Sequence, residues 1–296
     1  MDVPVQGKGT LFPATLTDEV LTKVKGKSSL TKLSKQMPIE FNGNQLFVFD
    51  MPNEVDIVAE NGKKGHGGVK VEPKVVAPIK IEYGARVSDE FMIASESRQK
   101  DILKGFIDGF AKKMAKGLDI MAMHGINPRT GEVSTVIGDN NFDKLVKTAI
   151  KYDKANPDEN IESAVTTIIA EENEVNGIAV STELATALAK YKVNGVKAFP
   201  EFAWGGNPEI VNGLNVDVNA TVSYKTNKDR AIVGDFENSF RWGVAKEIPM
   251  KIIEYGDPDG SGKDLANYNQ IYIRCEAYIG WAIFDEKAFT RIEEQA

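Results

Sequence analysis

Cysteine and histidine are scarce in this sequence: its 296 residues include one cysteine, Cys275, and two histidines, His66 and His124. A single cysteine excludes an intrachain disulfide and a zinc site built from several cysteines. The histidines lie far apart in the sequence, one in a glycine-rich turn and one at the end of a helical pattern, so we expect each to be isolated and exposed. The sequence therefore predicts neither a metal centre nor a nucleophile–base pair.

The sequence also lacks a long apolar run and an excess of positive charge. Its apolar runs are far shorter than the roughly 18 residues that a membrane span requires, and its N-terminus has no signal-peptide core. The formal net charge is −7, whereas dedicated nucleic-acid-binding proteins are normally basic. Hydrophobic residues make up 42% and charged residues 27%, as in globular proteins. We therefore expect a soluble protein, made without secretion, with a sizeable core.

Motifs for cofactors and catalysis are incomplete. The segment that begins at Asp257 resembles the start of a calcium-binding loop, but Tyr268 stands where such a loop needs a bidentate glutamate. Gly262 and Lys263 do not make a phosphate-binding motif, because Asp264 occupies the position of the required serine or threonine. No nucleophile, base and stabilising group converge in the sequence. We therefore predict that the chain is not an enzyme, and we expect no catalytic residue, cofactor or metal ligand.

The longest helical pattern runs from Asp89 to His124. Its apolar side chains recur every three or four residues, at Ile102, Phe106, Phe110, Met114, Leu118 and Met121. Gly125 predicts the end of the helix, which would be roughly 50 Å long at about 1.5 Å per residue. One row of the helix consists of Gly105, Gly109 and Gly117. A row of glycines predicts a close crossing by another element.

Residues 1–40 have too few apolar side chains to form a domain, so we interpret them as an arm that lies across something else. Thr17–Val24 is compatible with a short helix, and we expect the rest of the arm to be extended. Apolar residues then alternate from Phe41 to Val87 on both sides of the glycine-rich segment Asn61–Gly68, including a strand pattern up to residue 59. This pattern predicts a long β-hairpin with a flexible end. Such a hairpin has little core of its own, so we expect it to pack on a neighbour.

The rest of the chain mixes helix and strand patterns. We expect helices over residues 142–153, 161–173 and 183–191, and strands over residues 178–180, 214–218, 230–233, 248–255, 271–275 and 278–283. Either Ser181 or Thr182 caps the third of these helices. The last residues read as a charged tail. No fixed-period repeat and no long linker divides the chain.

The order of these parts resembles the major capsid protein family of tailed bacteriophages, whose fold is shared with encapsulins. Segments similar to the landmarks of that family follow one another along some two hundred residues: Ala85–Phe91, Met123–Gly125 with Gly131, Val180–Tyr191, Gly213–Val216, Gly234–Phe236, Asn269–Glu276 and Ala288–Phe289. The first resembles the start of the family's spine helix and the second resembles its end. In the third, Thr182 replaces a proline of the family pattern.

The resemblance implies an α+β protein with the phage major-capsid fold and a structural role. Its parts would be an N-terminal arm (1–40), an extended β-hairpin loop (41–84), a peripheral domain with the spine helix (85–124 and 249–280), and a mixed α/β axial domain (125–248 and 281–296). Copies would assemble in the host cytoplasm, as pentamers and hexamers, into the icosahedral shell of a virion. The shell would enclose phage double-stranded DNA.

The resemblance also implies partners. These are other copies of the chain and, as in members that use them, a separate scaffolding protein, a portal and decoration proteins, with no membrane. DNA would be held by confinement rather than by sequence-specific binding, and the acidic charge balance agrees, because a strongly positive lining would bind DNA through salt-sensitive contacts. Many members have an N-terminal scaffolding segment that is later removed. Here the arm begins close to Met1, so a separate scaffold and an already trimmed chain both stay open.

Two alternatives remain open on the sequence. The first is an encapsulin-like bacterial nanocompartment shell protein, which packages an enzyme; that family usually has a shorter, differently placed loop, so we rank it second. The other is an enzyme with a site in the α/β region, which the absence of a convergent polar set disfavours.

Some relatives form a covalent cross-link, in which a hairpin lysine joins an asparagine of another subunit with the help of a glutamate. By this resemblance the candidate residues are Lys63, Lys64, Lys70, Asn269 and Glu276. The reaction needs a neutral lysine and a carboxylate that moves protons. If Asn269 and Glu276 shared one strand, their offset of seven would place them on opposite faces, so they could cooperate only across subunits. We expect shells without this cross-link.

Overall fold

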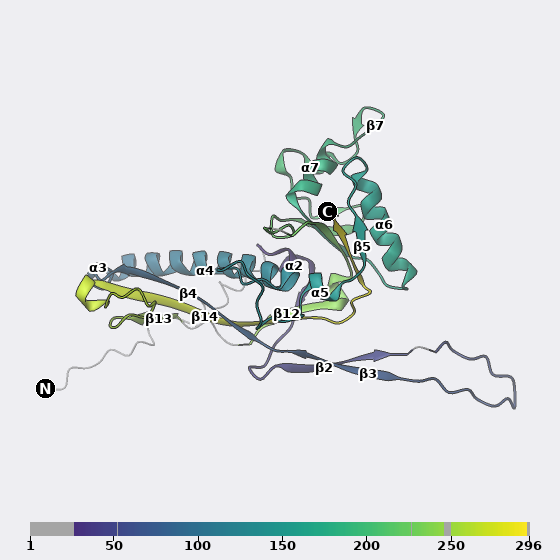
Figure 1. Ribbon diagram of the computed structural model, residues 1–296, viewed down its shortest axis with the longest axis horizontal. Helices are drawn as coiled ribbons and strands as arrows, with labels where there is room; N and C mark the ends of the chain where they lie inside the picture. Colours follow the sequence, from purple (N-terminus) through teal and green to yellow (C-terminus); the bar gives the residue numbers. More distant parts are fainter. Residues whose placement is uncertain (1–26, 52, 226, 246–249, 295–296) are drawn as a thin grey trace.

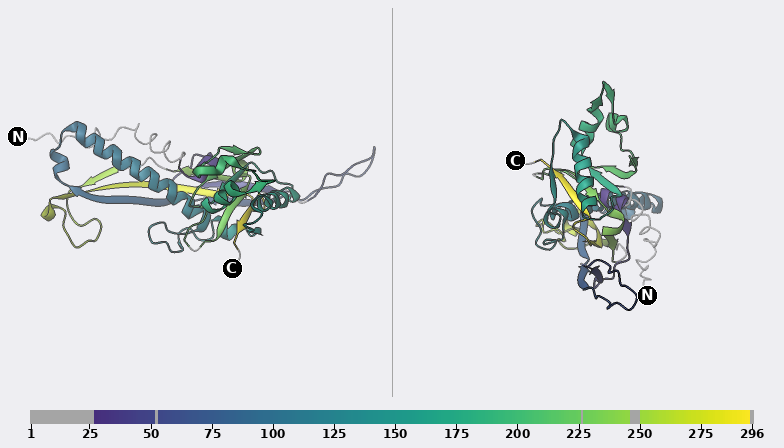
Figure 2. Two further views of the ribbon diagram at one scale, coloured as in Figure 1. Left: turned by 90° about the horizontal axis from the view of Figure 1, so that it is seen from above. Right: turned by 90° about the vertical axis from the view of Figure 1, so that its right-hand side faces the viewer.

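The structure, a computed structural model, describes residues 27–51, 53–225, 227–245 and 250–294. Three parts project from a common centre (Figure 1): a limb along α4 (Glu96–His124), an upright unit with α6 (Pro157–Ala170) and α7 (Thr182–Lys190), and a hairpin of β2 (Asn44–Asp50) and β3 (Lys70–Val76). The hairpin leaves the centre on the side opposite the limb, and a perpendicular view shows the same extended outline (Figure 2). The mixed helices and strands confirm the predicted α+β class. No helix in the described ranges is long and apolar enough to cross a lipid bilayer.

A five-stranded sheet lies along α4 and forms the limb with it. Its strands are β1 (Lys35–Gln36), β4 (Ile79–Ser88), β12 (Phe240–Val244), β13 (Met250–Ile253) and β14 (Gln270–Ile283). β14 is antiparallel to β4, β12 and β13. The prediction of two strands within this range is wrong, because Glu276 and Ala277 continue the pairing with β4 without a break.

The long helix is shorter than predicted at its start. Ala94 and Ser95 have extended ψ values of 156° and 149°, which separate the one-turn helix α3 (Glu90–Ile93) from α4. The prediction of a single helix is therefore wrong there. Its predicted end is confirmed, because Gly125 has φ 65° and ψ 22°, the left-handed conformation that commonly terminates a helix. With 29 residues, α4 is about 44 Å long.

The two faces of α4 have different surroundings. Its apolar face is buried over the C-terminal half, whereas Ile102 near the free end is 40% exposed. Among the described residues, a Cβ at Gly105 or Gly109 would meet nothing within 4 Å, and one at Gly117 would touch Pro128 at 3.6 Å and Met121 at 4.0 Å. No described element therefore makes the predicted close crossing at Gly105 and Gly109.

The extended loop is a hairpin only at its base. β2 and β3 pair antiparallel from Asn44 and Val76 to Asp50 and Lys70. The predicted strand at Leu46 and Val48 is confirmed by β2, but the described residues between the two strands form no strand, so its predicted continuation to residue 59 is wrong. The predicted second arm of the hairpin also divides, because β4 leaves the hairpin and pairs with β14. Its alternating pattern reflects a sheet with one face on the core, where Ile79 and Ile81 pack.

The described part of the N-terminal segment folds against the body. Ser29–Leu33 form a short helix, α2, capped by Ser28, and β1 pairs parallel with β12. Leu30 and Leu33 are buried in the main core. The expectation of an extended chain is therefore wrong for α2. The predicted helix Thr17–Val24 lies outside the described residues.

A six-stranded mixed sheet supports the upright unit, in the order β5–β15–β11–β6–β10–β9. Its strands are β5 (Ala149–Lys151), β6 (Gly177–Val180), β9 (Ile210–Val211), β10 (Leu214–Val218), β11 (Asp229–Gly234) and β15 (Phe289–Glu293). The predicted strands at 178–180, 214–218 and 230–233 are confirmed. α6 and α7 cover one core of this sheet, in which Ile168, Leu184 and Val233 are buried.

Two predictions fail in this sheet because neighbouring strands, rather than a local pattern, define the segments. The predicted helix over 142–153 ends after α5 (Phe142–Leu145), and β5 then pairs parallel with β15. The predicted charged tail contains β15, which pairs with β11. Within β15, Phe289 and Ile292 are buried, while Arg291 lies 3.3 Å from Glu293.

Short elements complete the described fold. They are β7 (Lys192–Val193), β8 (Val196–Lys197), the 3-10 helices η2 (Pro200–Gly205) and η3 (Ala266–Tyr268), and α8 (Phe236–Ser239). β7 and β8 form a small hairpin at the top of the upright unit (Figure 1). Of the two candidate caps of α7, Ser181 is the N-cap, since its hydroxyl accepts a hydrogen bond from the Leu184 N–H at 3.2 Å.

Candidate functional site

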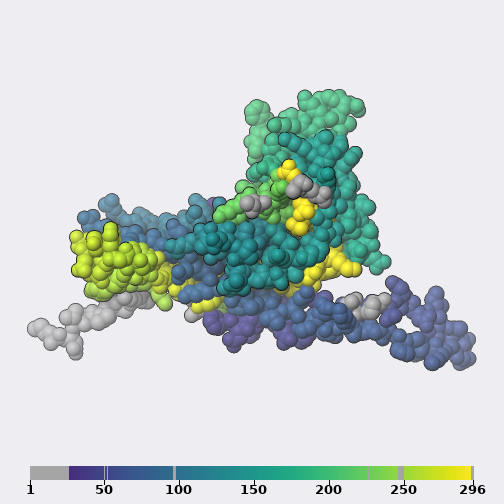
Figure 3. Space-filling view, viewed as in Figure 1, coloured from purple at the N-terminus to yellow at the C-terminus, as the bar shows by residue number. Residues whose placement is uncertain are grey.

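The extended loop presents large apolar side chains that the rest of the described chain leaves uncovered. Val55 and Ile57 are 95% and 97% exposed, and Phe47 and Phe49 are more than half exposed. The space-filling view shows the loop standing clear of the body (Figure 3). Exposed apolar surface of this kind marks an interaction site. The loop is therefore the first candidate surface for contact with another molecule.

The predicted cross-link lysines all belong to this loop. Lys63 and Lys64 are exposed in the segment between the strands, and Lys70 is the first residue of β3. Lys70 Nζ lies 2.5 Å from Glu72 Oε1. This ion pair brings the pKa of Glu72 below its ordinary value.

The predicted asparagine and glutamate lie in a different part of the molecule. Asn269 has φ 52° and ends η3, outside β14, so the premise that it shares a strand with Glu276 is wrong. Glu276 is 8% exposed, and its Oε1 lies 3.1 Å from Lys80 Nζ. Burial alone would raise the pKa of Glu276, but Lys80 brings it below the ordinary value. The loop before β14 lies at the end of the molecule opposite the hairpin tip (Figure 1), so one copy does not bring the five residues together.

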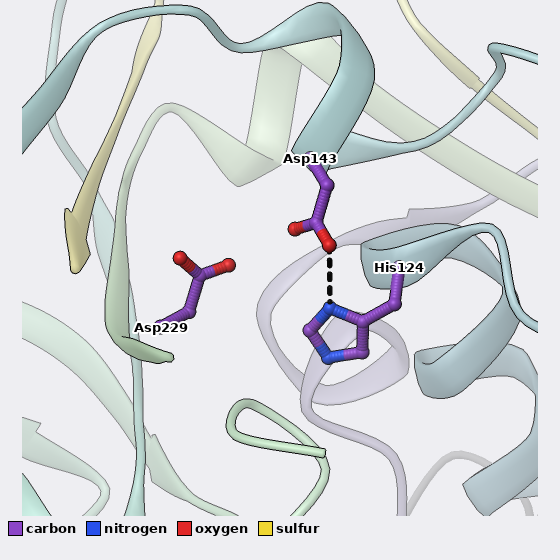
Figure 4. Close-up of side chains that lie close together, drawn as sticks. All are labelled: His124, Asp143 and Asp229. Carbon is purple, nitrogen blue, oxygen red and sulfur yellow. Dashed lines mark hydrogen bonds and ion pairs between the residues drawn. The ribbon is translucent and has the colours of Figure 1, made fainter. Parts of the chain in front are cut away.

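A buried polar cluster lies where the limb meets the upright unit. His124 is the last residue of α4, Asp143 belongs to α5 and Asp229 begins β11 (Figure 4). His124 Nδ1 lies 3.1 Å from Asp143 Oδ2, and His124 Nε2 lies 2.8 Å from the carbonyl oxygen of Thr221. The expectation of an exposed His124 is wrong, since it is 5% exposed. His66, by contrast, is exposed as expected.

The hydrogen bonds of this cluster show where its proton lies. A carbonyl oxygen only accepts, so His124 Nε2 carries a hydrogen. The other ring nitrogen faces a carboxylate, which favours the doubly protonated ring. Burial would lower the pKa of His124, but Asp143 raises it above the ordinary value. Burial and the charge of Asp143 raise the pKa of Asp229 to about 7, and Arg291, 3.0 Å from Asp229 Oδ1, opposes that shift.

The three side chains offer ligand-type atoms within 4.8 Å of one another, so a metal ion has to be considered. The negative charges of Asp143 and Asp229 are already balanced by the guanidinium of Arg291 and by the one extra proton that the cluster binds. A divalent cation in place of that proton would leave an excess positive charge next to Arg291, which burial disfavours. The donor set therefore fits a charge-balanced structural cluster better than a metal site.

A second buried carboxylate lies one turn away on the same helix. Asp119 is fully buried and accepts hydrogen bonds from the backbone N–H groups of Ser29 and Leu30 at 3.0 and 3.2 Å, at the start of α2. It also accepts from the Thr221 hydroxyl at 2.9 Å. Burial raises the pKa of Asp119 to about 6, although these hydrogen bonds oppose the shift. Because Thr221 also bonds His124, the two clusters are linked.

Sequence reasoning missed both clusters because their members come from distant segments. Asp143, Thr221, Asp229 and Arg291 converge on His124 only through the topology of the sheet. One signal was present: Asp119 interrupts the apolar face of the predicted helix next to Leu118. A carboxylate on a buried helix face needs donors, and that need alone points to a buried partner.

Comparison with known proteins places these features in a family. A sequence profile of the Phage capsid family matches residues 8–293. A solved chain from Mycobacterium phage Ogopogo is 31% identical with a TM-score of 0.77, and the match covers 91% of this chain and 92% of that chain. A chain from Gordonia phage Cozz is 23% identical with a TM-score of 0.75, over 91% and 87% of the two chains. A comparison with curated proteins finds no match.

More distant structures share the fold. A chain described as "Capsid of empty GTA particle computed with C5 symmetry" is 14% identical, with a TM-score of 0.63 over 91% of this chain and 90% of that chain. The profile match spans nearly the whole sequence, and the match at 31% identity extends over most of both chains. The chain therefore belongs to the phage capsid family.

Proposed function

We propose that this chain, a major capsid protein that forms an icosahedral shell, assembles as pentamers and hexamers and encloses double-stranded phage DNA. The observation that carries the proposal is the extended loop, whose apolar side chains find no cover in one described copy. Its role is structural and its place is the virion capsid. Assembly in the host cytoplasm, and partners such as a separate scaffolding protein, a portal and decoration proteins, belong to the same proposal.

We also propose a division of the chain according to role. The parts are an arm (1–40), an extended loop (41–84), a peripheral domain (85–124 and 249–280) and an axial domain (125–248 and 281–296). The three projections of the fold support this division, since the loop, the limb and the upright unit each leave the centre in a separate direction (Figure 1). Each can then contact a different neighbour in a shell.

The outward face of α4 is the surface that suits the loop of a neighbouring copy. Between Arg98 and Lys116 the helix carries six cationic residues and two acidic ones. The loop carries the exposed acidic side chains of Glu54, Asp56 and Glu60, with no basic residue between them. Opposite charges on the loop of one copy and on α4 of another favour the encounter of the two surfaces and fix their register.

Shape supports the same pairing. No described residue covers α4 at Gly105 and Gly109, and the absence of a side chain at both positions allows another backbone to approach the helix closely. Val55 and Ile57 of the loop would gain apolar cover next to Ile102, which is itself partly exposed. A contact of this kind would explain why Gly105 and Gly109 face no other described element of their own copy.

A charge-reversal experiment tests this arrangement. We expect the triple variant Glu54→Lys/Asp56→Lys/Glu60→Lys to form few shells in negative-stain micrographs while its subunit keeps the wild-type melting temperature. The combined change Lys112→Glu/Lys113→Glu should partly restore assembly. The matched control is Glu132→Lys/Asp139→Lys, which reverses exposed acidic residues beyond α4. Wild-type shell yield from the triple variant would contradict the proposed contact.

A further inference from the structure

Trp204 is a large apolar side chain that the described part of its own copy leaves uncovered. It is fully exposed (103%), while the other two tryptophans, Trp242 and Trp281, are 0% and 1% exposed. Its φ of 60° and ψ of 25° are left-handed, a conformation that is a genuine outlier for a bulky residue. A large apolar side chain held in the open by a strained backbone points to a contact with another molecule.

The turn around Trp204 is built to hold the indole outward. Phe202, two residues before it, is 4% exposed and anchors the turn in the core under α7. At Gly206 any Cβ would lie 2.1 Å from the carbonyl oxygen of Glu201, so only glycine allows the chain to close on itself there. Asn207 follows the turn and joins it to β10: its amide donates to Asp217 Oδ1 at 3.0 Å, and its side-chain oxygen accepts from the Val218 N–H at 2.8 Å. These contacts hold the backbone of the turn, so the Trp204 side chain stays on the outside of it.

A groove of about 470 Å³ lies between this turn and α7. Its α7 wall consists of small side chains, Ala185, Thr186 and Ala189, and Lys190 and Lys197 add positive charge. Grooves of roughly 300–1,000 Å³ hold groups of drug size, so an indole fits. Trp204 itself lies at the edge of the groove and leaves it open.

We propose that Trp204 of one copy inserts into the α7 groove of a second copy in the same shell. The inference rests on the proposed function, since it requires copies of the chain to meet. Charge supports this occupant: the Trp204 turn carries the exposed acid Glu201, and the groove carries Lys190 and Lys197. Within the described residues none of these three has a salt bridge.

Because Trp204 lies at the edge of the groove, the indole and the groove are neighbouring parts of one surface. Two copies that face each other with this surface can therefore each insert a tryptophan into the groove of the other. A tryptophan in a pocket lined by small side chains is also the typical centre of an interface, because large aromatic side chains contribute much of the binding energy. Trp204 would thus be a specific anchor between copies rather than a general surface residue.

Native fluorescence tests, without a substitution, whether Trp204 becomes covered when the shell assembles. In unassembled subunits only Trp204 should be quenched by acrylamide, since the other two tryptophans are buried. The variant Trp204→Phe should lose this quenchable signal, which assigns it. In wild-type shells we expect the quenching constant to fall several-fold and the emission to shift to the blue. A Trp204 signal that is equally quenchable in subunits and shells would overturn the proposal.

Photo-cross-linking tests which surface receives the indole. With p-benzoylphenylalanine at position 204, irradiated shells should yield dimers in which the probe is joined to residues 182–197 of the other copy. Cross-links elsewhere, or protection of Trp204 only after a different shell-binding protein is added, would overturn the inference while the shell function stands. If wild-type protein never assembles, the proposed function itself fails. If only the probe variant fails to assemble, wild-type fluorescence still tests whether assembly covers Trp204, and the probe at Thr186 in the groove should then yield cross-links to residues 200–206 of the other copy.

Discussion

Asp119 and His124 lie five positions apart on α4, and both bond Thr221. Asp119 holds the start of α2, while His124 ties the end of the helix to α5 through Asp143. At the scale of single residues, these two side chains join the N-terminal segment, the limb and the upright unit at one point. Their interactions are buried, where a lost hydrogen bond has a larger effect than at the surface.

Replacing Asp119 should release α2. The variant Asp119→Ala leaves the N–H groups of Ser29 and Leu30 and the Thr221 hydroxyl without an acceptor, so we expect unfolding free energy to fall by about 2 kcal/mol. Urea denaturation of unassembled subunits measures this change. Asp101→Asn, an exposed position on the same helix, is the control and should stay within about 0.5 kcal/mol of wild type. An equally small effect at Asp119 would contradict its role.

The same clusters predict how subunit stability depends on pH. Asp119 and Asp229 have pKa values of about 6 and about 7 in the fold, above the ordinary 3.8, so the stability that they contribute is fully present below pH 3.8 and is lost as pH rises through 6 and 7. The raised pKa of His124 acts in the same direction above pH 6.5. The lowered pKa of Asp143 acts oppositely, since its contribution is lost only as pH falls below 3.8.

We therefore expect the melting temperature of unassembled subunits to fall between about pH 5 and about pH 8. Asp229→Asn should make this decline smaller, because the amide resembles the protonated carboxyl and does not titrate. Its Nδ2 can donate to Asp143 Oδ1, which has no hydrogen-bond partner among the described residues. Thermal melts of both proteins across this range provide the measurement. A wild-type melting temperature that rises over the range would show that the cluster does not bind its proton as described.

At the scale of elements, segments that carry their own pattern could be predicted, and segments defined by their neighbours could not. The apolar stripe and Gly125 located α4 and its end, and continuous apolar runs located β6 and β11. β15 could not be found, because Phe289 and Ile292 are buried in two different cores, so its sequence does not alternate and forms a strand only beside β11. The His124 cluster was missed for the same reason, since chain topology alone brings its members together.

The extended loop should change its protease sensitivity on assembly. Residues 53–69 form no strand, and Lys63 and Lys64 are exposed, so trypsin should cleave there readily in unassembled subunits. By the proposed contact a neighbouring copy covers the loop in shells, so we expect cleavage to slow at least about tenfold, as for a segment whose opening costs about 1.4 kcal/mol more. Mass spectrometry of timed digests gives both rates. Cleavage at equal rates in the two states would argue against loop contacts between copies.

At the scale of the whole molecule, the candidate cross-link residues lie at opposite ends. Lys63 and Lys64 are in the loop, whereas Asn269 lies beyond η3, and Glu276 already faces Lys80. The ion pair with Lys80 lowers the pKa of Glu276, which makes this carboxylate a weaker base for taking the proton of an attacking lysine. We therefore expect boiled shells to give one monomer band on denaturing gels. A ladder of larger bands that disappears in Asn269→Ala would establish the cross-link.

The outline of the molecule also bears on its state of assembly. Loop, limb and upright unit project separately, and the loop and the Trp204 turn each leave large apolar side chains in solvent. A chain of this shape buries these side chains when it meets other copies. Removal of any one contact should therefore weaken assembly more than it lowers the stability of the subunit core.

Negative-stain electron microscopy of the purified chain, paired with sedimentation of the same sample, shows whether copies of the chain assemble into a shell. We expect rings of five or six copies and closed shells, with little protein sedimenting as a monomer at high concentration. A uniform 32.5 kDa species at every salt and protein concentration, with no rings or shells in the micrographs, would contradict it.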